Sequence, residues 1–455
     1  MRSDDWFIPL NIGRTALEWR LRAIDSATES IDLQTFLWSN DAVGDEISQA
    51  LIAAANRGVT VKLLLDDSFT VNESEFLATL NRHPNIDTRI YNPFHYRPDN
   101  VAIREMFNLG EFSRIDRRMH NKVLVIDNIA SIIGGRNQAD EYFGHHAKAN
   151  FRDMEVLAYG EVSQQISKSF DAYWNSGWAF PLETLGSNAN DAQQPGNVPG
   201  GQPYLRQFLP VESTESLASA WRGAATTGFG GQASLLVDAP AGETPSVESA
   251  TLLAAQMLRW IDQAEHELIA VSAYLIPTQE LQQAVERALA RGVKIKILTN
   301  SLQSNNHTSA HAAYRHHITQ LLELGVEVYE LRAFASGRAL YMDAPVESKS
   351  LGLHAKFMLI DDDVSFIGSA NLDARSLKLN TEIGLMIRSA ALNGRVRELI
   401  AHDFQLSNAW LLQQRDGGSI VWVGDSITHK EQPSDSTWQR LEDWFFGLLP
   451  IENEM

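Results

Sequence analysis

The strongest constraint on this chain is a pattern of polar residues that occurs twice in the same register. Each copy reads H-x-K-x4-D and is followed, at one fixed distance, by G-[GS]-x-N. The copies are His120, Lys122, Asp127, Gly134, Gly135 and Asn137, and His354, Lys356, Asp361, Gly368, Ser369 and Asn371. Every residue of the second copy lies 234 positions after its counterpart. A single match can arise by chance, whereas two matches in one register indicate a duplicated catalytic half-site.

The repeat extends beyond these motifs and predicts two lobes of one fold. Residues 56–65, N-R-G-V-T-V-K-L-L-L, match residues 290–299, A-R-G-V-K-I-K-I-L-T, at the same offset. In each segment the glycine ends a helix, and the β-branched run after it is typical of a buried strand. Residues 31–38 and 268–275 are the matching first strands.

Each half is predicted to contain three helix–strand pairs, then the motif strand, a second short strand and a closing helix. We expect the motif strands at 121–127 and 356–361, with the glycine-rich turns bringing Asn137 and Asn371 back beside the histidines. This alternation is typical of an α/β fold with helices on both faces of the sheet. The predicted architecture is two tandem α/β/α sandwich lobes related by a pseudo-twofold axis, with the active site at their interface.

Composition suggests where the lobes begin and end. Residues 186–203 are rich in Gly, Pro, Asn and Gln and indicate a flexible linker, and 223–245 indicate an irregular connection. We therefore expect an N-terminal lobe at 1–185, a linker and connection at 186–247, a C-terminal lobe at 248–425 and an amphipathic tail at 426–455.

The tail has apolar residues spaced along one face of a helix. They are Trp438, Leu441, Trp444, Phe445 and Leu448. We expect this helix to pack its apolar face on the domain, and contact with a membrane surface is the alternative.

Charge and composition exclude several classes of function. Lysine and arginine number 38 against 57 acidic residues, a net charge of −19, which disfavours tight nucleic-acid binding. The absence of cysteine excludes disulfides, thiolate metal sites and cysteine nucleophiles. No stretch approaches 18 apolar residues, and the first six residues carry no hydrophobic signal region. The chain is expected to be soluble as given, and whether an anchor or signal once preceded it stays open.

The repeated side chains suit a phosphodiester. Residues i and i+2 of a strand point to the same side, so each histidine projects with its lysine. If the lobes pack symmetrically, two lysines and two asparagine amides can surround the phosphoryl oxygens and stabilise transition-state charge without any metal. One imidazole can attack phosphorus, while the other protonates the leaving alkoxide and later activates the incoming hydroxyl.

Four carboxylates accompany the motifs. Asp127 and Asp361 lie at the exits of the motif strands, where we expect structural hydrogen bonds to backbone or arginine groups. Asp153 and Glu382 follow the asparagines and are the candidates to bond the back nitrogen of each histidine and fix its tautomer. An ordinary acid at a strand edge is the alternative for either one.

On these residues the chain resembles the phospholipase D superfamily, whose hallmark is the duplicated H-x-K-x4-D. The resemblance spans about residues 15 to 425, and within the superfamily it is greatest to bacterial cardiolipin synthases of the C type. The segments R-R-M-H-N-K at 117–122, G-S-A-N-L-D-A-R-S at 368–376 and L-N-T-E-I-G at 379–384 carry it. Gly135 stands where many members, like the second half at Ser369, have serine, so the halves are not equivalent.

The resemblance implies a ping-pong reaction through a phosphohistidine, with no metal or organic cofactor. It favours His120 as nucleophile and His354 as general acid/base. It also implies a phosphatidyltransferase that makes cardiolipin, with phosphatidylglycerol and phosphatidylethanolamine as substrates. Hydrolysis to phosphatidic acid is the alternative, and a nuclease-type phosphodiesterase is less favoured. The implied setting is the surface of the bacterial inner membrane, with no nucleic-acid partner, and the leaflet and oligomeric state are left open.

Three further features of the sequence are candidates for a function. Residues 94–118 mix aromatics with arginines and could form a lipid-binding rim, or simply a solvated loop. His307 and His311 have the i, i+4 spacing of some zinc sites, but the glutamate of H-E-x-x-H is missing, so no zinc is expected. Asp66 and Asp67 end a strand, where either a turn or a place at the site entrance would suit them.

Overall fold

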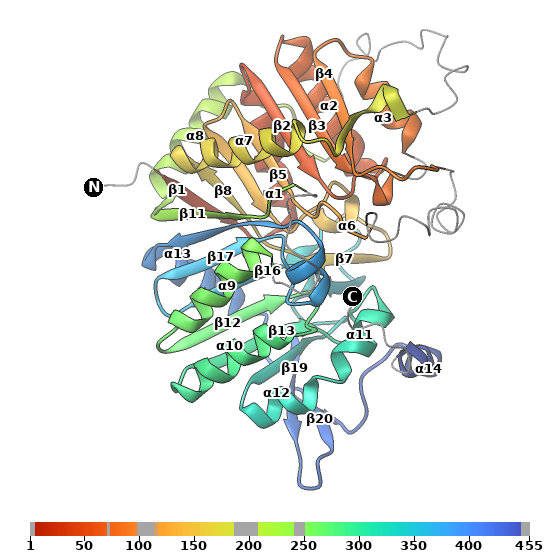
Figure 1. Cartoon of the computed structure of the whole chain (residues 1–455), viewed down its shortest axis with the longest axis vertical. Helices are drawn as coiled ribbons and strands as arrows, with labels where there is room; N and C mark the ends of the chain where they lie inside the picture. The colour runs from red at the N-terminus through yellow and green to blue at the C-terminus, as the bar shows by residue number, and fades with distance from the viewer. Residues whose placement is uncertain are drawn as a thin grey trace.

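The computed structural model describes residues 5–70, 73–97, 114, 116–185, 208–240 and 251–446. It has two α/β lobes, the N-terminal one (red to yellow) above the C-terminal one (green to blue) in Figure 1. The predicted α/β fold with two tandem lobes is confirmed. In the part of the chain that is described, none of the helices has the length and apolar character needed to cross a membrane.

The N-terminal lobe is built on a nine-stranded sheet with the order β10-β1-β8-β6-β5-β2-β3-β4-β9. Its strands are β1 (Trp6–Leu10), β2 (Ser30–Thr35), β3 (Thr60–Asp66), β4 (Ile86–Tyr91), β5 (Val123–Ile126), β6 (Ala130–Gly134), β8 (Glu155–Tyr159), β9 (Ala179–Pro181) and β10 (Phe229–Gly230). Its helices are α1 (Gly13–Ser26), α2 (Ala42–Asn56), α3 (Ser74–Asn81), α6 (Asp140–Phe143), α7 (Glu161–Trp174) and α8 (Thr214–Thr227). Strands β2, β3 and β4 are parallel, and β5 runs antiparallel to β2.

The C-terminal lobe has a ten-stranded sheet with the order β11-β18-β17-β16-β12-β13-β14-β19-β20-β21. Its strands are β11 (Gln232–Val237), β12 (Glu267–Ser272), β13 (Lys294–Asn300), β14 (Glu327–Leu331), β16 (Lys356–Ile360), β17 (Val364–Gly368), β18 (Ile383–Arg388), β19 (Ala409–Gln414), β20 (Ile420–Val423) and β21 (Thr428–His429). Its helices are α9 (Leu252–Gln263), α10 (Gln279–Ala290), α11 (Thr308–Arg315), α12 (Ile318–Leu324), α13 (Ala390–Ile400) and α14 (Thr437–Phe446). The central strands of the two sheets correspond one to one, from β1 and β11 through to β9 and β19, as a duplicated fold requires.

The motif strands are apolar on both faces because both faces are covered. In β5, Leu124 and Ile126 join the core under the helices, whereas Val123 and Val125 join a core between the lobes. Strands of this kind read as continuous hydrophobic runs rather than as alternating ones. The polar residues His120 and Lys122 of the motif directly precede this apolar strand.

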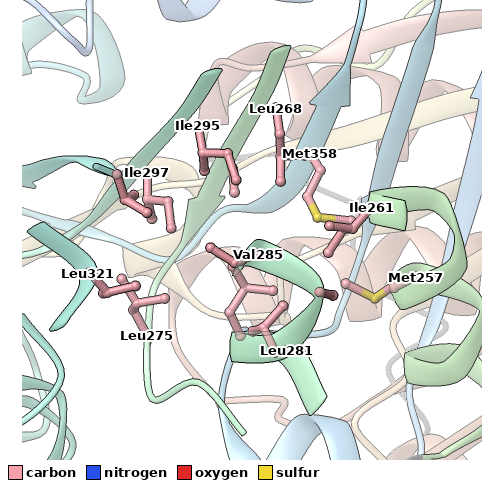
Figure 2. Packing of buried hydrophobic residues seen from close by; sticks show 14 of the residues in the cluster. Met257, Ile261, Leu268, Leu275, Leu281, Val285, Ile295, Ile297, Leu321 and Met358 are labelled. Carbon is pink, nitrogen blue, oxygen red and sulfur yellow. The ribbon is translucent and has the colours of Figure 1, made fainter. Parts of the chain in front are cut away.

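The helix-side core of the C-terminal lobe shows how its strands are fixed (Figure 2). Side chains of α9 and α10, such as Met257, Ile261 and Val285, pack against Leu268 of β12 and Ile295 of β13. Complete burial of a leucine or isoleucine contributes roughly 1.5–3 kcal/mol. This packing holds the carboxyl ends of β12 and β13 at one defined edge of the sheet.

The two lobes are joined by a shared core and by backbone pairing. Residues of both sheets, including Ile133, Val156, Phe357 and Leu385, are buried against one another. A separate two-stranded parallel sheet connects β7 (Ala149–Arg152) of the first lobe to β15 (Ser350–Leu353) of the second. The relative position of the lobes is therefore fixed by hydrogen bonds as well as by apolar contact.

The connection between the lobes is more regular than its composition suggests. The expected irregular segment 223–245 includes the end of α8, β10 and β11, and β11 pairs along its length with β18. The second lobe therefore begins before the expected boundary at 248. Because the segment is rich in glycine, the sequence did not predict this edge strand. Its regular structure comes from its pairing with β18. Residues 186–207 and 241–247 of the expected linker and connection lie outside the described residues, as do residues 248–250 of the expected C-terminal lobe.

The tail corrects one expectation. The side chains of Trp438, Leu441, Trp444 and Phe445 on α14 are 50–72% exposed, so the prediction that this helix packs its apolar face on the domain is wrong. The buried face of the helix carries Asp443 instead, which is 2% exposed. Leu448 lies outside the described residues, and the segment from 426 also includes β21, which extends the sheet.

Candidate active site

The two motif histidines lie at the interface between the lobes. His120 and His354 immediately precede the motif strands, and each stands at the carboxyl end of the neighbouring strand, β2 or β12. The His120 backbone N–H donates to Thr381 O of the other lobe at 2.9 Å, and the His354 N–H donates to Arg152 O at 2.9 Å. Each motif is thus held by the backbone of the opposite lobe.

Each histidine is also bonded to a carboxylate of the opposite lobe. His120 Nδ1 lies 2.9 Å from Glu382 Oε2, and His354 Nδ1 lies 2.7 Å from Asp153 Oδ2. Asp153 directly follows β7, and Glu382 directly precedes β18. A carboxylate on Nδ1 sets the imidazole tautomer and orientation, so Nε2 of each ring is left for chemistry.

The two lysines are buried beside the histidines. Lys122 Nζ donates to His120 O at 2.7 Å, and Lys356 Nζ donates to His354 O. Burial, together with the charge of Lys356, lowers the pKa of Lys122 to about 7, against the raising effect of Glu382. Burial also lowers the pKa of Lys356 to about 8, against the raising effect of Asp153 and Glu382. Because the charge of Lys356 affects the pKa of Lys122, the two copies of the motif lie close enough to form one site.

The histidines respond to the same charges. Burial, followed by the charges of Lys122 and Lys356, lowers the pKa of His120 well below its usual value. Burial and Lys356 lower the pKa of His354 to about 3. Both rings are therefore neutral at pH 7 in the absence of an anion, and beside them stand Lys356, which is mostly protonated at that pH, and Lys122, which is partly protonated. Such a site favours a negatively charged ligand.

The two carboxyl groups differ in their protonation. Burial raises the pKa of Glu382 to about 8, only partly offset by Lys122 and Ser369. Burial acts in the same direction on Asp153, but the contact with His354 and the charge of Lys356 lower its pKa below the usual value. The His354–Asp153 pair thus contains an ionised acid, whereas Glu382 retains a proton near neutral pH.

Gly135 and Ser369 mark a second difference between the two half-sites. Ser369 Oγ donates to Glu382 Oε2 and accepts from the Ile383 N–H at 3.0 Å. At the equivalent position of the first lobe, a Cβ atom on Gly135 would lie 2.2 Å from Asp153 Oδ1. The carboxylate of Asp153 occupies the space that a serine side chain fills in the second lobe. The first lobe therefore combines the shorter acid, Asp153, with glycine, whereas the second combines Glu382 with serine.

The two asparagines complete the set of donors. Asn137 Oδ1 accepts from the Leu37 N–H at 3.3 Å, and its amide is within hydrogen-bonding reach of the Tyr142 hydroxyl. Within the described residues, Asn371 Oδ1 is buried and has no hydrogen-bond partner. A buried carbonyl oxygen without a partner favours a ligand that brings a hydrogen-bond donor, such as a hydroxyl group, because an unsatisfied polar atom is costly.

Aromatic rings flank both histidines, and sequence reasoning missed them. The Phe36 ring meets the His120 ring edge-on, with 4.9 Å between the two centroids. Lys122 Nζ lies 5.2 Å from the centroid of the Phe36 ring. Tyr142 and Phe151 contact the His354 ring at 5.0 and 5.4 Å. Phe36 directly follows the carboxyl end of β2, and this position was the signal that could have identified it.

Asp127 and Asp361 lie away from the reacting groups, at the far ends of the motif strands. Asp127 accepts from the backbone N–H groups of Thr28, Glu29 and Ser30 at 2.8–2.9 Å. Asp361 accepts three in the same way from residues 265–267. Their φ angles are 50° and 47°, a left-handed conformation that aspartate tolerates better than most residues. Each carboxylate thus ties the end of a motif strand to the segment at the start of β2 or β12.

The other candidates have structural partners. Asp66 accepts from the Met119 N–H at 2.9 Å, and Asp67 binds Arg97 at 2.8 Å, so both acids anchor the chain that leads to the first motif. His311 Nδ1 lies 2.8 Å from Asp443 of α14. Residues 98–113 and 115, the greater part of the proposed lipid rim, lie outside the described residues.

Comparisons with known proteins agree with this geometry. The family model described as "Cardiolipin synthase, PLD-like domain" matches residues 21–174 and 257–404. Cardiolipin synthase C of Escherichia coli K12 is 33% identical over 454 residues, which cover 98% of this chain and 95% of that protein. Cardiolipin synthase B of the same strain is 27% identical over 400 residues, which cover 87% and 80%.

A solved structure also shares the fold. The crystal structure of phosphatidylserine synthase from Haemophilus influenzae Rd KW20 superimposes with a TM-score of 0.61 at 16% identity. The match covers 90% of this chain and 87% of that one. At this level of identity the similarity establishes the two-lobed architecture alone.

Proposed function

This chain belongs to the phospholipase D superfamily, where it is of the cardiolipin synthase-like type, and from that premise we propose that it is a phosphatidyltransferase that makes cardiolipin. One observation carries the proposal. The histidines of both lobes, each bonded through Nδ1 to an acid of the other lobe, stand with two buried lysines in one site. That arrangement supplies a nucleophile, an acid/base and a phosphate-binding pair.

In the first half-reaction His120 is the nucleophile, the role that the family resemblance favours. Its Nε2 attacks the phosphorus of a phospholipid, so that a P–N bond forms while the P–O bond to the headgroup alcohol breaks. His354 Nε2 gives its proton to the departing oxygen. The ammonium groups of Lys122 and Lys356 and the amides of Asn137 and Asn371 stabilise the charge on the remaining phosphoryl oxygens.

In the second half-reaction a lipid hydroxyl takes the phosphatidyl group. His354 Nε2 removes the hydroxyl proton, the oxygen attacks phosphorus, and the bond to His120 breaks. Burial and Lys356 hold the pKa of His354 at about 3 in the anion-free site. The negative charge of a bound phosphodiester offsets the lysines and raises this pKa toward the range of a general acid.

The substrates are phospholipids at the surface of the bacterial inner membrane. Phosphatidylglycerol is the acceptor, because its headgroup carries free hydroxyls, and phosphatidylglycerol or phosphatidylethanolamine is the donor. Relatives named cardiolipin synthase support this substrate class. The net charge of −19 disfavours a nucleic-acid substrate.

Mass spectrometry of lipid products tests the proposal. Purified protein with mixed phosphatidylglycerol and phosphatidylethanolamine should yield cardiolipin, and His120→Asn or His354→Asn should lower the rate by about 10³-fold or more. His266→Asn is the matched control, since His266 is exposed and lies at the opposite end of the sheet from the site. Phosphatidic acid as the main product would instead identify a hydrolase, and cleavage of plasmid DNA a nuclease.

The covalent intermediate separates the roles of the histidines. Brief incubation with donor lipid, followed by peptide mass spectrometry, should find the phosphatidyl group on His120 and none on that position in His120→Asn. A modified His354 in the wild type would reverse the assigned roles.

A further inference from the structure

The C-terminal helix α14 turns its apolar face outward. Trp438 is 72% exposed, and Leu441, Trp444 and Phe445 are 50–55% exposed. A surface helix of a globular protein normally buries such a face. Resting on the proposed function, we propose that this face docks the protein on a phospholipid bilayer with the active-site edge toward the lipid.

Polar contacts fix the helix in this orientation. Asp443 lies 2.8 Å from His311 Nδ1 and 3.1 Å from Arg315 of α11. One turn earlier, Gln439 Nε2 donates to Leu302 O at 2.8 Å. Because the hydrogen-bonding face is the one attached to the protein, the apolar face cannot turn inward without breaking the buried Asp443–His311 contact and the Asp443–Arg315 ion pair.

The helix is attached to the active-site edge of its lobe. Leu302 belongs to the segment that follows the carboxyl end of β13, the edge at which His354 lies. In the same segment, Asn306 Oδ1 accepts from the Tyr274 hydroxyl at 2.9 Å, and Tyr274 follows the carboxyl end of β12. Figure 1 shows α14 beyond α11, on the side of the molecule where α6 and β7 lie.

Other exposed apolar side chains stand on segments that leave the same edges of the sheets. Phe69 follows β3, is 47% exposed, and packs on Phe36, the ring that contacts His120. Phe334 and Leu340 follow β14 and are 51% and 50% exposed. Apolar groups from both lobes therefore accompany the site.

The chemistry of this surface favours a bilayer. Tryptophan and phenylalanine partition to the membrane interface, where apolar rings enter the acyl boundary. The net charge of −19 makes electrostatic attraction to anionic lipid unfavourable, so apolar insertion has to supply the binding. A second copy of the chain seated on the same edge would cover the site, whereas a bilayer presents the phosphodiester to it.

Vesicle co-sedimentation of the full chain tests the docking surface. The variant Trp438→Ser/Trp444→Ser/Phe445→Ser should bind phosphatidylglycerol–phosphatidylethanolamine vesicles at least tenfold more weakly than the wild type, at both low and high salt. Ile129→Ser/Ile427→Ser is the matched control, because these side chains are 45% and 47% exposed on turns between strands and should leave binding unchanged. Brominated lipid should quench tryptophan fluorescence in the wild type.

Detergent-dispersed substrate separates docking from chemistry. The triple variant should keep wild-type turnover of phosphatidylglycerol in mixed micelles, with an unchanged Tm, while losing turnover on vesicles. Equal vesicle binding by variant and wild type overturns the docking surface. So does a wild-type dimer that the variant converts to a monomer with vesicle binding intact. A wild type that binds vesicles but turns over no lipid in either form overturns the proposed function instead and leaves the docking surface standing.

Discussion

Gly135 and Asp153 lie so close that a Cβ atom on the glycine would be 2.2 Å from the carboxylate oxygen Oδ1. The other Asp153 oxygen bonds His354 Nδ1 at 2.7 Å, and Oδ1 accepts from the Met154 N–H at 2.7 Å. These two hydrogen bonds fix the Asp153 carboxylate beside position 135. The absence of a side chain at position 135 thus controls the orientation of a histidine in the other lobe.

Substituting Gly135 should therefore impair catalysis through His354. Gly135→Ala displaces the Asp153 carboxylate, and we expect kcat for lipid transfer to fall by about 10- to 100-fold, because the imidazole loses its orienting acid. Gly394→Ala, in α13, is the control, since an added Cβ there has no atom within 4 Å. Unchanged kcat in Gly135→Ala would show that the carboxylate can shift without consequence.

The two acids should respond differently to amide substitution. Glu382 already retains a proton near pH 7 because burial raises its pKa to about 8, whereas Asp153 is ionised. Glu382→Gln therefore changes the charge of the site less than Asp153→Asn does. At pH 7 we expect Asp153→Asn to lower kcat by about 10³-fold and Glu382→Gln by about tenfold.

Exposed Glu398→Gln, at 70% side-chain exposure, is the control for these amide variants. Steady-state kinetics at pH 7 and pH 9 measures the difference. The gap between the two variants should narrow at pH 9, where Glu382 of the wild type loses its proton. Equal losses at both pH values would contradict the assigned protonation.

The lysines should make anion binding pH-dependent. Their pKa values of about 7 and 8 mean that Lys122 and Lys356 lose protons as the pH rises through that range, while an ordinary lysine stays charged. Inorganic phosphate should bind more tightly at pH 6.5 than at pH 9 and should take up protons on binding near pH 8. Calorimetry in buffers of different ionisation enthalpy measures that uptake.

Arginine at either lysine position separates charge from geometry. Arginine does not deprotonate in this range, so Lys356→Arg should lose much of the pH dependence of phosphate binding even if its activity is low. If the phosphate affinity of the wild type did not change between pH 6.5 and pH 9, the pKa values of the two lysines would lie outside that range.

Asp127 should matter for stability rather than for chemistry. Removing its carboxylate in Asp127→Ala leaves the N–H groups of Thr28, Glu29 and Ser30 without their acceptor and should lower the free energy of unfolding by about 1–3 kcal/mol. These bonds lower the pKa of Asp127 against the opposing effect of burial. Its contribution is therefore present above the unfolded-state pKa and is lost as the pH falls through the folded-state value.

Urea denaturation at pH 7 and at pH 3 measures this effect. The difference between Asp127→Ala and the wild type should shrink at pH 3, and kcat of the folded variant should stay within about threefold of the wild type. Exposed Asp416→Asn is the control for loss of a surface charge. A large fall in kcat with unchanged stability would give Asp127 a catalytic role.

The local pattern of apolar and polar residues was sufficient to predict most of the fold. The motif strands were expected at 121–127 and 356–361 and occur as Val123–Ile126 and Lys356–Ile360, because a strand buried on both faces has a continuous apolar sequence. Strand β1 (Trp6–Leu10) was missed, since it is short, contains a proline and owes its regularity to β8 and β10.

The exchange of acids between the lobes was not visible in the sequence. Asp153 and Glu382 could be picked out by position, but nothing local states that each bonds the histidine of the other half. The orientation of α14 escaped prediction for a similar reason. It depends on Asp443 meeting His311, a contact across 132 residues that periodicity does not report.

The parallel ladder between β7 and β15, with its counterpart at Met119 and Thr381, means that half a molecule is chemically incomplete. A lobe expressed alone would carry a histidine and a lysine but lack the acid that orients its ring. Such a lobe would regain that acid only by pairing with a second copy of itself. Within one chain the two sides need not be identical, and the glycine-with-aspartate and serine-with-glutamate combinations show that here they are not.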